Sequence, residues 1–464
     1  MTSDTYSLSE VIKVAEIHPF YNADRKYPPD PEAIHKALQY SSTESKQIDL
    51  HLQPLLRKDD IYRVIKRLTN DTDPRNEYRR SVYISTTGGG SGGLPLMFAT
   101  DTKENRKQRA VFGEFLKICK VIEPNDWVLS THTSGFLYRS LDLVSEILEN
   151  AGASVLCAGS RMDAAEVVHT LINYRVNVLT GDSSQIIHIV HHISTLPAEQ
   201  RSEIRVNKVI YTSDLMTFTQ RSYILKVLGA VKILSILGSA EAGPYAIANP
   251  DITGRCISSA RDFVFDTRTM LIEILHSSTI NEDSSFGKFG GKPVPEGEQG
   301  IIVQTSLQRL RNPLVRYITG DVGSIHRIPE AAAGLLPESE VKYLRVLRLG
   351  GRDRRFSFKW FGEYFNFEEI ENLMQTEGSG ILQWQVILDS FDSSPQSTLE
   401  VRMLRAAAGE GVMDRNTFVA LVETFFFVFP ENRHLFRVNL LDDLEGFEKS
   451  STGNKIMKLV NRFD

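Results

Sequence analysis

The segment 83–102, YISTTGGGSGGLPLMFATDT, holds five glycines within six positions, and hydroxyl side chains stand beside them. Glycine permits positive φ and lets the backbone approach a ligand closely. Successive backbone N–H groups in such a loop can bind an anion. No Gly-Lys-Ser/Thr follows, which excludes a Walker A motif, and the chain continues into LPLMF instead of a helix, which excludes a dinucleotide fingerprint. The segment is therefore either a phosphate-binding loop or a flexible connection.

Two carboxylates follow glycines at the ends of apolar stretches. Glu241 lies in ILSILGSAEAGP and Asp321 in PLVRYITGDVGSI. Mg²⁺ favours a carboxylate together with phosphate oxygens and water, which suits Glu241 beside a phosphate loop. A carboxylate such as Asp321 can accept both hydroxyls of a ribose. The alternatives are an exposed glutamate in a turn and an ordinary Gly-Asp turn.

Two segments in the last quarter of the chain carry candidate cations. The segment 350–371, GGRDRRFSFKWFGEYFNFEEIE, sets four of them beside aromatic residues, and EKSSTGNKIMKLVNRFD delivers Lys455 near the C-terminus. The alternatives are a solvated charge run and a frayed tail.

Strand and helix patterns alternate between residues 126 and 238. Strand-like stretches are DWVLSTHTS, ASVLCAG, VNVLTG, NKVIYTS and AVKILSILG, separated by helical patterns such as DAAEVVHTLINYR with its Asp163 N-cap. Such alternation predicts βαβ units and a parallel sheet. Ligands bind at the carboxyl ends of strands in these sheets.

The rest of the chain predicts two further regions. Residues 255–350 are β-rich, and a smaller α+β unit follows, with helices at FEEIENLMQ and NTFVALVETFFFVF. The predicted fold class is α/β, with a large N-terminal domain that combines a parallel βαβ sheet and a β-rich subdomain, and a small mobile α+β C-terminal domain. The predicted boundary divides residues 1–351 from 352–464.

Composition excludes several classes of protein. With a formal net charge of -5 and no basic cluster, nothing favours a nucleic-acid partner. No run approaches the roughly 20 apolar residues of a membrane span, and the N-terminus lacks the pattern of a signal peptide. Three scattered cysteines form no CxxC and fit a reducing compartment, so we expect a cytoplasmic protein. His188, His191 and His192 share one predicted helix, where a structural role is expected because no fourth ligand is in view.

The order of these segments resembles the adenylate-forming superfamily of acyl-CoA synthetases, adenylation domains and luciferases. Within it, the chain looks most like the phenylacetate-CoA ligase branch. EIHPFYNADR, QPLLRKDDIY, SAEAGP and LRNPLVRYITGDVGSI are similar to segments of that branch. The resemblance covers nearly the whole chain, and it does not specify a substrate.

The resemblance implies roles for individual residues. The β- and γ-phosphates of ATP would be held by Thr86, Thr87, Ser91, Gly92 and Gly93. Further nucleotide-binding residues would be Ser213, Asp214, Gly238, Ser239, Ala240, Asp321 and Arg352. Glu241 would bind Mg²⁺, and Arg354 would be the hinge between the domains. Lys455 would reach the substrate carboxylate and the α-phosphate, with Lys458 and Lys449 as alternatives because STGNK spaces its lysine one residue further than the family does.

The activity that the resemblance implies is ATP-dependent activation of a carboxylic acid, followed by transfer of the acyl group to coenzyme A. His132, Phe136 and Tyr138 would line the acyl pocket, and its aromatic rings suit an aryl or arylacetic acid or else belong to the core. Leu94 stands where the family loop has a lysine. The alternatives are transfer to an amine, transfer to a carrier-protein phosphopantetheine, and an inactive nucleotide-binding protein. No motif predicts an oligomeric state.

Overall fold

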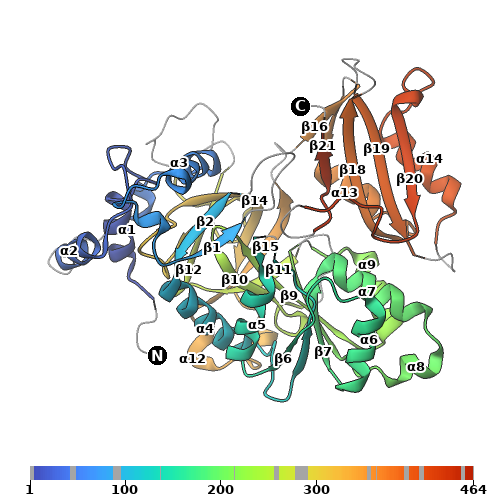
Figure 1. Ribbon diagram of the computed structural model, residues 1–464, viewed down its shortest axis with the longest axis horizontal. Coiled ribbons are helices and arrows are strands. Elements are labelled where there is room, and N and C mark those ends of the chain that lie inside the picture. Colours follow the sequence, from blue (N-terminus) through green and yellow to red (C-terminus); the bar gives the residue numbers. More distant parts are fainter. Residues whose placement is uncertain are drawn as a thin grey trace.

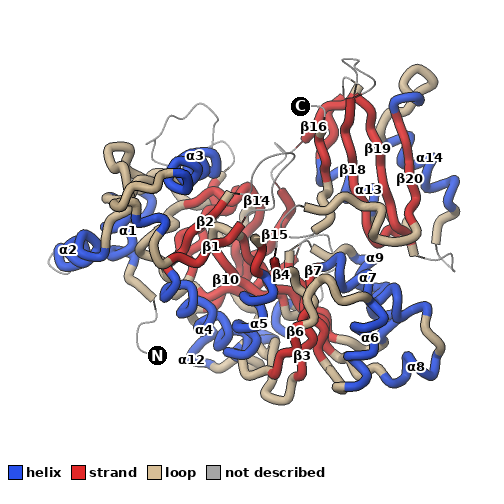
Figure 2. The backbone as a smooth tube through the Cα atoms, viewed as in Figure 1, coloured by secondary structure: helices blue, strands red, loops and turns tan. Residues whose placement is uncertain are grey.

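The computed structural model describes residues 5–41, 49–86, 96–135, 137–213, 215–254, 261–276, 291–352, 357–361, 363–390, 397–406, 412–450 and 455–462. These residues form two bodies (Figure 1). The large unit is built on an eleven-stranded sheet and the small unit on a four-stranded sheet. Helices flank both sheets (Figure 2). The mixed α/β architecture with a separate small sheet domain confirms the predicted fold class.

Five strands at one end of the large sheet run parallel. Their spatial order is β6 (Ser154–Cys157), β3 (Trp127–Ser130), β7 (Val178–Asp182), β8 (Lys208–Thr212) and β9 (Lys232–Ser239). The helices between them are α5 (Ser140–Asn150), α6 (Ala164–Asn173), α7 (Ser183–Thr195), α8 (Ala198–Glu203) and α9 (Phe218–Leu228). The alternation seen in the sequence is therefore confirmed as βαβ units.

Both faces of these parallel strands are covered. Leu129 and Leu179 belong to a core with residues of α6, α7 and α9. Their neighbours Val128 and Val178 belong to a second core, with residues of α5 and α4 (Thr102–Ile118). Successive side chains of a strand point to opposite faces, so a strand with both faces covered carries apolar residues at successive positions, as Val128 and Leu129 and likewise Val178 and Leu179 do.

The β-rich region continues the same sheet. Beyond β9 the order is β10 (Gly243–Ala248), β11 (Arg261–Asp266), β15 (Leu344–Arg352), β14 (Tyr317–His326), β13 (Gly300–Ser306) and β12 (Met270–Leu275), all antiparallel. β10 is a strand that the sequence analysis does not predict. It turns the SAEAGP segment into the tip of a β9–β10 hairpin, at the point where the sheet changes from parallel to antiparallel.

The N-terminal region packs against the antiparallel half. It contains α1 (Leu8–Glu16), α2 (Pro31–Ser41), α3 (Lys58–Asn70) and the antiparallel pair β1 (Val82–Thr86) and β2 (Met97–Asp101). The helix α3 buries Ile61, Ile65 and Leu68 in a core shared with residues of β10, β11 and β14. Lys58 and Tyr62 of α3 are thereby carried toward the β9–β10 turn.

The small unit has the strand order β20 (Phe436–Leu441), β19 (Ser397–Arg405), β18 (Ile381–Ser390) and β21 (Leu459–Asn461). The helices α13 (Phe367–Met374) and α14 (Arg415–Phe425) and the hairpin of β16 (Ser357–Trp360) and β17 (Glu363–Asn366) accompany it. Its core is rich in aromatic rings, with Trp360, Phe365 and Phe426 fully or nearly buried. The division after residue 351 stays a prediction, because β15 runs to Arg352 and residues 353–356 lie outside the described ones.

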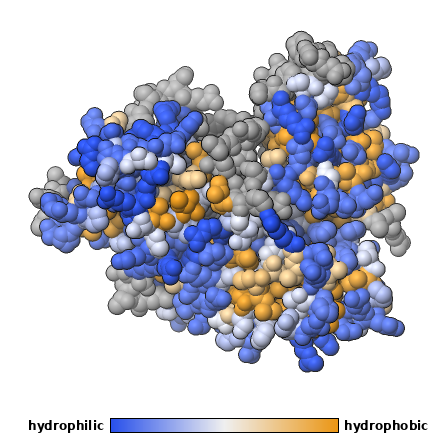
Figure 3. Space-filling model, in the orientation of Figure 1, coloured by the Kyte–Doolittle hydropathy of each residue, from blue (hydrophilic) through white to orange (hydrophobic). Residues whose placement is uncertain are grey.

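The small unit is docked on the helices of the parallel half. Leu382, Phe447 and Ile456 share a core with residues of α6, α7 and α9. The side chain of Gln383 donates a hydrogen bond to Ser184 Oγ at 2.7 Å, and Gln220 donates one to the carbonyl of Leu382. In the space-filling view, hydrophilic side chains cover much of the rim of the visible face, and hydrophobic ones gather nearer its middle (Figure 3). Among the described residues, no helix combines the length and apolar character that crossing a membrane requires.

Candidate active site

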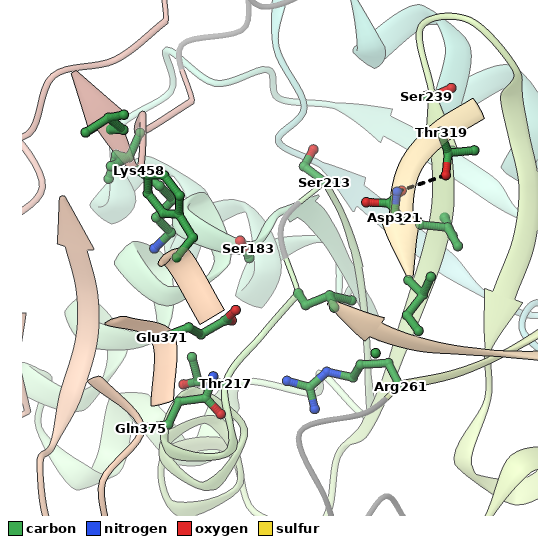
Figure 4. A pocket seen from close by; sticks show the side chains of 18 of the residues that line it. Ser183, Ser213, Thr217, Ser239, Arg261, Thr319, Asp321, Glu371, Gln375 and Lys458 are labelled. Carbon is green, nitrogen blue, oxygen red and sulfur yellow. Dashed lines mark hydrogen bonds between the residues drawn. The ribbon is translucent and has the colours of Figure 1, made fainter. Parts of the chain in front are cut away.

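A cavity of about 650 Å³ lies between the two units. Six of the residues singled out in the sequence line it: Lys458 of the small unit, and Ser213, Gly238, Ser239, Glu241 and Asp321 of the large unit. In the large unit they come from the residue after β8, from the end of β9 with the turn after it, and from within β14, so Asp321 is not at the end of its strand as the sequence analysis expected. Figure 4 shows Ser239, Thr319 and Asp321 on one side of the cavity, and Lys458 and Glu371 of the small unit on the other. The cavity is therefore closed by residues from both units.

The Glu241 carboxylate is buried, and three side chains hold it. Its Oε1 accepts hydrogen bonds from the hydroxyls of Tyr62 and Tyr317, the latter at 3.1 Å, and lies 3.8 Å from the Lys58 ammonium. Burial alone would raise the pKa of the Glu241 carboxyl, but the Lys58 charge and the donated hydroxyls outweigh it and lower the pKa. Glu241 is therefore an anion at neutral pH.

The backbone of the β9–β10 turn fixes where this carboxylate lies. A Cβ at Gly238 would meet the Gly243 carbonyl oxygen at 2.8 Å, so only glycine fits the close approach of the two strands. Ser239 Oγ accepts a hydrogen bond from the Ala242 N–H at 3.0 Å. Below the turn, the buried Arg309 guanidinium donates to the Glu241 carbonyl. Ala240 lies in this turn and does not line the cavity.

Asp321 reaches the cavity from β14. Gly320 before it has φ +82°. The Asp321 N–H donates to Thr319 Oγ1 at 3.0 Å, which fixes the local course of the backbone within β14 (Figure 4). In the β14–β15 ladder, Asp321 stands directly opposite Arg352. The backbone therefore pairs two of the residues that the sequence analysis assigns to the nucleotide.

Lys58 is a cavity residue that the sequence analysis did not single out. It lines the cavity beside Glu241, and its ammonium lies 5.2 Å from the centre of the Tyr62 ring. The signal was the spacing of Lys58 and Tyr62, four residues apart and so on one face of α3. What the sequence did not reveal is that this face meets the β9–β10 turn.

Lys455 does not itself line the cavity, and it lies beside two of the three residues assigned to the acyl pocket. Its ammonium is 5.1 Å from the centre of the Tyr138 ring. Burial, aided by the charge of Lys455, lowers the pKa of His132 to about 3, so this imidazole is neutral. His132 Nε2 lies 3.1 Å from Thr180 Oγ1. The next residue, Ile456, and Lys458 line the cavity, so Lys455 stands at its edge.

The two alternative lysines occupy different places. Lys458 lines the cavity, with its ammonium 2.5 Å from Gln383 Oε1. Lys449 does not line it and lies 3.9 Å from the Glu445 carboxylate. Of the three lysines, Lys455 is therefore the one beside Tyr138 and His132, and Lys458 the one inside the cavity.

The remaining residues singled out in the sequence are only partly described. Thr86 ends β1, where its hydroxyl donates to the Leu137 carbonyl at 2.8 Å, and it does not line the cavity. Arg352 is described as part of β15. Outside the described residues lie Thr87, Ser91, Gly92, Gly93, Phe136, Asp214 and Arg354. Their assigned roles stay predictions.

The histidines of α7 take part in local contacts. His191 Nδ1 lies 3.0 Å from the Tyr223 hydroxyl. Within the described ranges, no group of three or more His, Cys, Asp or Glu side chains is arranged to hold a metal ion.

The neutral His132 makes the stability of the fold depend on pH. In the unfolded chain this group titrates near its ordinary pKa of 6.5, so between pH 6.5 and about 3 the unfolded state binds a proton that the folded state does not. Stability therefore falls as pH falls, by up to about 1.4 kcal/mol per pH unit for one group. We expect His132→Asn to reduce this pH dependence of thermal unfolding between pH 5 and 6.5. An unchanged dependence would contradict the burial of a neutral imidazole.

No protein-family model and no curated protein sequence matches the chain. Solved structures do. A 2-hydroxyisobutyryl-CoA ligase, in the postadenylation state in complex with R3-HIB-AMP, matches with a TM-score of 0.63 and 17% identity over 97% of this chain and 87% of that one.

The same ligase in an open conformation with 2-HIB-AMP and CoA matches with a TM-score of 0.52 and 17% identity, over 97% of this chain and 88% of that one. In the thioesterification state its TM-score is also 0.52. This chain has the fold of the adenylate-forming enzymes.

Proposed function

We propose that the protein uses ATP and Mg²⁺ to convert a carboxylic acid into an acyl-adenylate, and then transfers the acyl group to coenzyme A, as a phenylacetate-CoA ligase-like enzyme. One observation carries the proposal. The two carboxylates picked out from the sequence, Glu241 and Asp321, line one cavity between the units, and Lys455 stands at its edge beside two proposed acyl-pocket residues. The fold shared with a CoA ligase that binds acyl-adenylates supports it.

In this proposal the nucleoside binds on the Asp321 side. The Asp321 carboxylate accepts the ribose hydroxyls, with Arg352 opposite it in the ladder. Residues of the nucleotide site are Ser213, Asp214, Gly238, Ser239 and Ala240. The triphosphate extends toward the glycine loop, with contacts from Thr86, Thr87, Ser91, Gly92 and Gly93. Leu237 and Leu349, both cavity residues, supply apolar surface.

Glu241 fits a Mg²⁺ site of the kind that uses one protein carboxylate and substrate phosphates. The carboxylate is anionic, and its three side-chain contacts all fall on Oε1. Bound Mg²⁺ would neutralise negative charge on the phosphates. Lys58 is close enough to share that task.

The chemistry in the first step joins two anions. A carboxylate oxygen of the acid attacks the α-phosphorus of ATP, and pyrophosphate leaves with the electrons of the broken P–O bond. Lys455 offsets the repulsion and stabilises the charge that develops. Because His132 is neutral, Lys455 supplies the positive charge on that side. The pocket bounded by His132, Phe136 and Tyr138 holds the acyl group, for which an aryl or arylacetic acid is the proposed class.

In the second step the thiol of coenzyme A attacks the acyl carbon, and AMP leaves. This step requires Lys455 to move away, so the small unit turns about Arg354, a change of the hinge type. The TM-score is 0.63 against the CoA ligase in its postadenylation state and 0.52 against the same ligase in its thioesterification state, which supports a rearrangement of the units between the two steps in that ligase.

The experiment is pyrophosphate release from ATP and Mg²⁺ with a panel of aryl, arylacetic, amino and fatty acids, each with and without coenzyme A. We expect acid-dependent release that turns over only with coenzyme A. Pyrophosphate release with one acid that coenzyme A does not increase would indicate that the acyl group is transferred to an amine or to a carrier protein. No release with any acid would contradict the proposal, and binding of ATP by calorimetry would then identify an inactive nucleotide-binding protein.

Lys58 gives a separate prediction on pH. Its charge helps to lower the pKa of Glu241, so Lys58→Met raises that pKa and lets Glu241 take up a proton at higher pH. Because the protonated acid cannot hold Mg²⁺, activity should be lost at a higher pH on the acidic side of the profile. Lys58→Arg keeps the charge and should keep the wild-type profile. Identical pH profiles of activity for Lys58→Met and Lys58→Arg would contradict the role of the Lys58 charge.

A further inference from the structure

Gln304 is a buried amide in the wall of the cavity that has no part in the chemistry proposed above. It belongs to β13, is 1% exposed and lines the cavity. Its side-chain Nε2 is buried and forms no hydrogen bond to another described residue. A buried N–H without an acceptor is unfavourable, because the group has given up its hydrogen bonds to water. Gln304 therefore offers a hydrogen bond to an occupant of the cavity.

Gln304 lies in a cluster with Tyr245, Tyr317 and Asp321, all of which line the cavity. In the β13–β14 ladder it stands directly opposite Tyr317, so these two side chains lie on one face of the sheet. Burial raises the pKa of the Tyr245 hydroxyl, the Asp321 charge adds to the rise, and the Gln304 amide opposes it. Both groups are therefore close to that hydroxyl, although the amide makes no hydrogen bond of ordinary geometry with it.

The two tyrosines of the cluster are uncharged at neutral pH. Burial raises the pKa of Tyr317, and the Glu241 charge adds to the rise. The Tyr317 hydroxyl is already engaged, because it donates to Glu241 Oε1 at 3.1 Å, and the Lys58 ammonium lies 3.8 Å from the same oxygen. Glu241 and Lys58 thus belong to the β9–β10 turn, and the charged member of the Gln304 cluster is Asp321.

The charges of Arg261, Glu371 and Lys458 lie at other places in the cavity. Figure 4 shows Glu371 and Lys458 on the small unit, across from Asp321. Arg261 begins β11, and its guanidinium donates to the Met216 carbonyl. A phosphoryl group placed in the Gln304 cluster would face the Asp321 carboxylate, which disfavours it. An uncharged polar group suits this part of the cavity better.

A hydroxyl is the uncharged group that fits both polar members of the cluster. It can donate to the Asp321 carboxylate and still accept from the Gln304 Nε2. We propose that Gln304 donates a hydrogen bond to a ribose hydroxyl of the bound nucleotide and so helps the enzyme to select ribonucleotides over deoxyribonucleotides. The inference rests on the proposed function, since it takes ATP as the occupant and Asp321 as the acceptor of its ribose hydroxyls. A deoxynucleotide leaves the buried N–H without its acceptor, which is the source of the selectivity.

The test compares the binding of ATP, 2′-deoxy-ATP and 3′-deoxy-ATP by calorimetry in the wild type and in Gln304→Met. We expect the wild type to bind ATP more tightly than at least one deoxy analogue. Gln304→Met should lower that ratio of affinities roughly 2- to 10-fold, the range for one hydrogen bond between uncharged groups. The loss should fall on ATP, because the analogue has no oxygen for the amide to reach. Any preference that the variant retains belongs to Asp321.

Two further variants make the comparison specific. Gln304→Asn keeps an amide and withdraws it by one methylene, so it should lose the same part of the ratio, and it carries the test if Gln304→Met does not fold. Gln200→Met, on the exposed α8, is the matched control and should keep the wild-type ratio.

A purely structural role of Gln304 would weaken the binding of all three nucleotides equally and leave the ratio unchanged. That result, or a wild type that binds ATP and both deoxy analogues equally well, would overturn the inference and leave the proposed function standing. A wild type that binds none of the three nucleotides and releases no pyrophosphate would overturn both.

Discussion

Replacing Lys455 by Met is expected to lower the rate of adenylate formation about 100- to 1,000-fold, the usual cost of removing one group that stabilises transition-state charge. The neutral His132 beside it cannot take over the positive charge. The position of the lysine over the Tyr138 ring, at the edge of the cavity, places that charge beside the proposed acyl pocket. Acid-dependent pyrophosphate release in single-turnover experiments measures this step.

The same experiment compares the three lysines near the C-terminus. Lys449→Met should retain activity, because Lys449 lies outside the cavity beside Glu445. Lys458→Met should raise the KM for ATP more than it lowers kcat. Transfer from preformed acyl-adenylate to coenzyme A should survive in Lys455→Met. A variant of Lys455 that forms adenylate at the wild-type rate, while one of the other two does not, would contradict the assignment.

Glu241→Gln is the second substitution with a large expected effect. It keeps the size of the side chain and removes the charge, so the Lys58 ammonium and the proposed Mg²⁺ both lose their carboxylate. We expect kcat/KM for ATP to fall at least about 100-fold, since the metal offsets much of the phosphate charge. Raising the Mg²⁺ concentration should restore part of the activity. Glu199→Gln, on the exposed α8, is the control.

The pH dependence of this site has a definite sign. The pKa of Glu241 is lowered in the fold. The contribution of its charged carboxylate to stability is therefore fully present above the ordinary pKa of a glutamate, and it is lost only as pH falls through the lowered pKa. The wild type should therefore hold Mg²⁺ in mildly acidic solution. At lower pH, where Glu241 takes up a proton, Mg²⁺ binding to the wild type should fall in a step. Glu241→Gln should show no such step, because its amide does not titrate. A step of the same size in both proteins would assign it to another group.

Local patterns were enough to predict much of the fold. The apolar runs of β3, β7, β8 and β9 and the helices between them follow from their periodicity and their caps, such as Asp163, whose side chain accepts from the Glu166 N–H. Pairing at long range was not visible. β11 pairs with β15, about eighty residues later in the chain, and so joins the β-rich region to the parallel sheet. A strand's own sequence says which face is apolar and not which partner it takes.

In the candidate site, too, local features could be predicted from the sequence and long-range contacts could not. Glu241 and Asp321 were identified from a local feature, a glycine near the end of an apolar stretch, and both line one cavity, although Asp321 lies within β14 and not at its end. Lys58 was missed because its contact with Glu241 joins residues far apart in the sequence. The choice between Lys455 and Lys458 also depended on tertiary structure, since both follow the same polar segment and only the placement of Tyr138 and Gln383 separates them.

The central claim is that a carboxylate oxygen of the acid becomes bonded to the α-phosphorus of ATP. The most direct measurement uses the acid that supports pyrophosphate release, labelled with ¹⁸O in its carboxyl group, and analyses the AMP by mass spectrometry after acyl transfer. The account predicts AMP that carries one labelled oxygen, because the thiol attacks the acyl carbon and the labelled bridging oxygen leaves with phosphorus. Unlabelled AMP, or ADP as the nucleotide product, would contradict it.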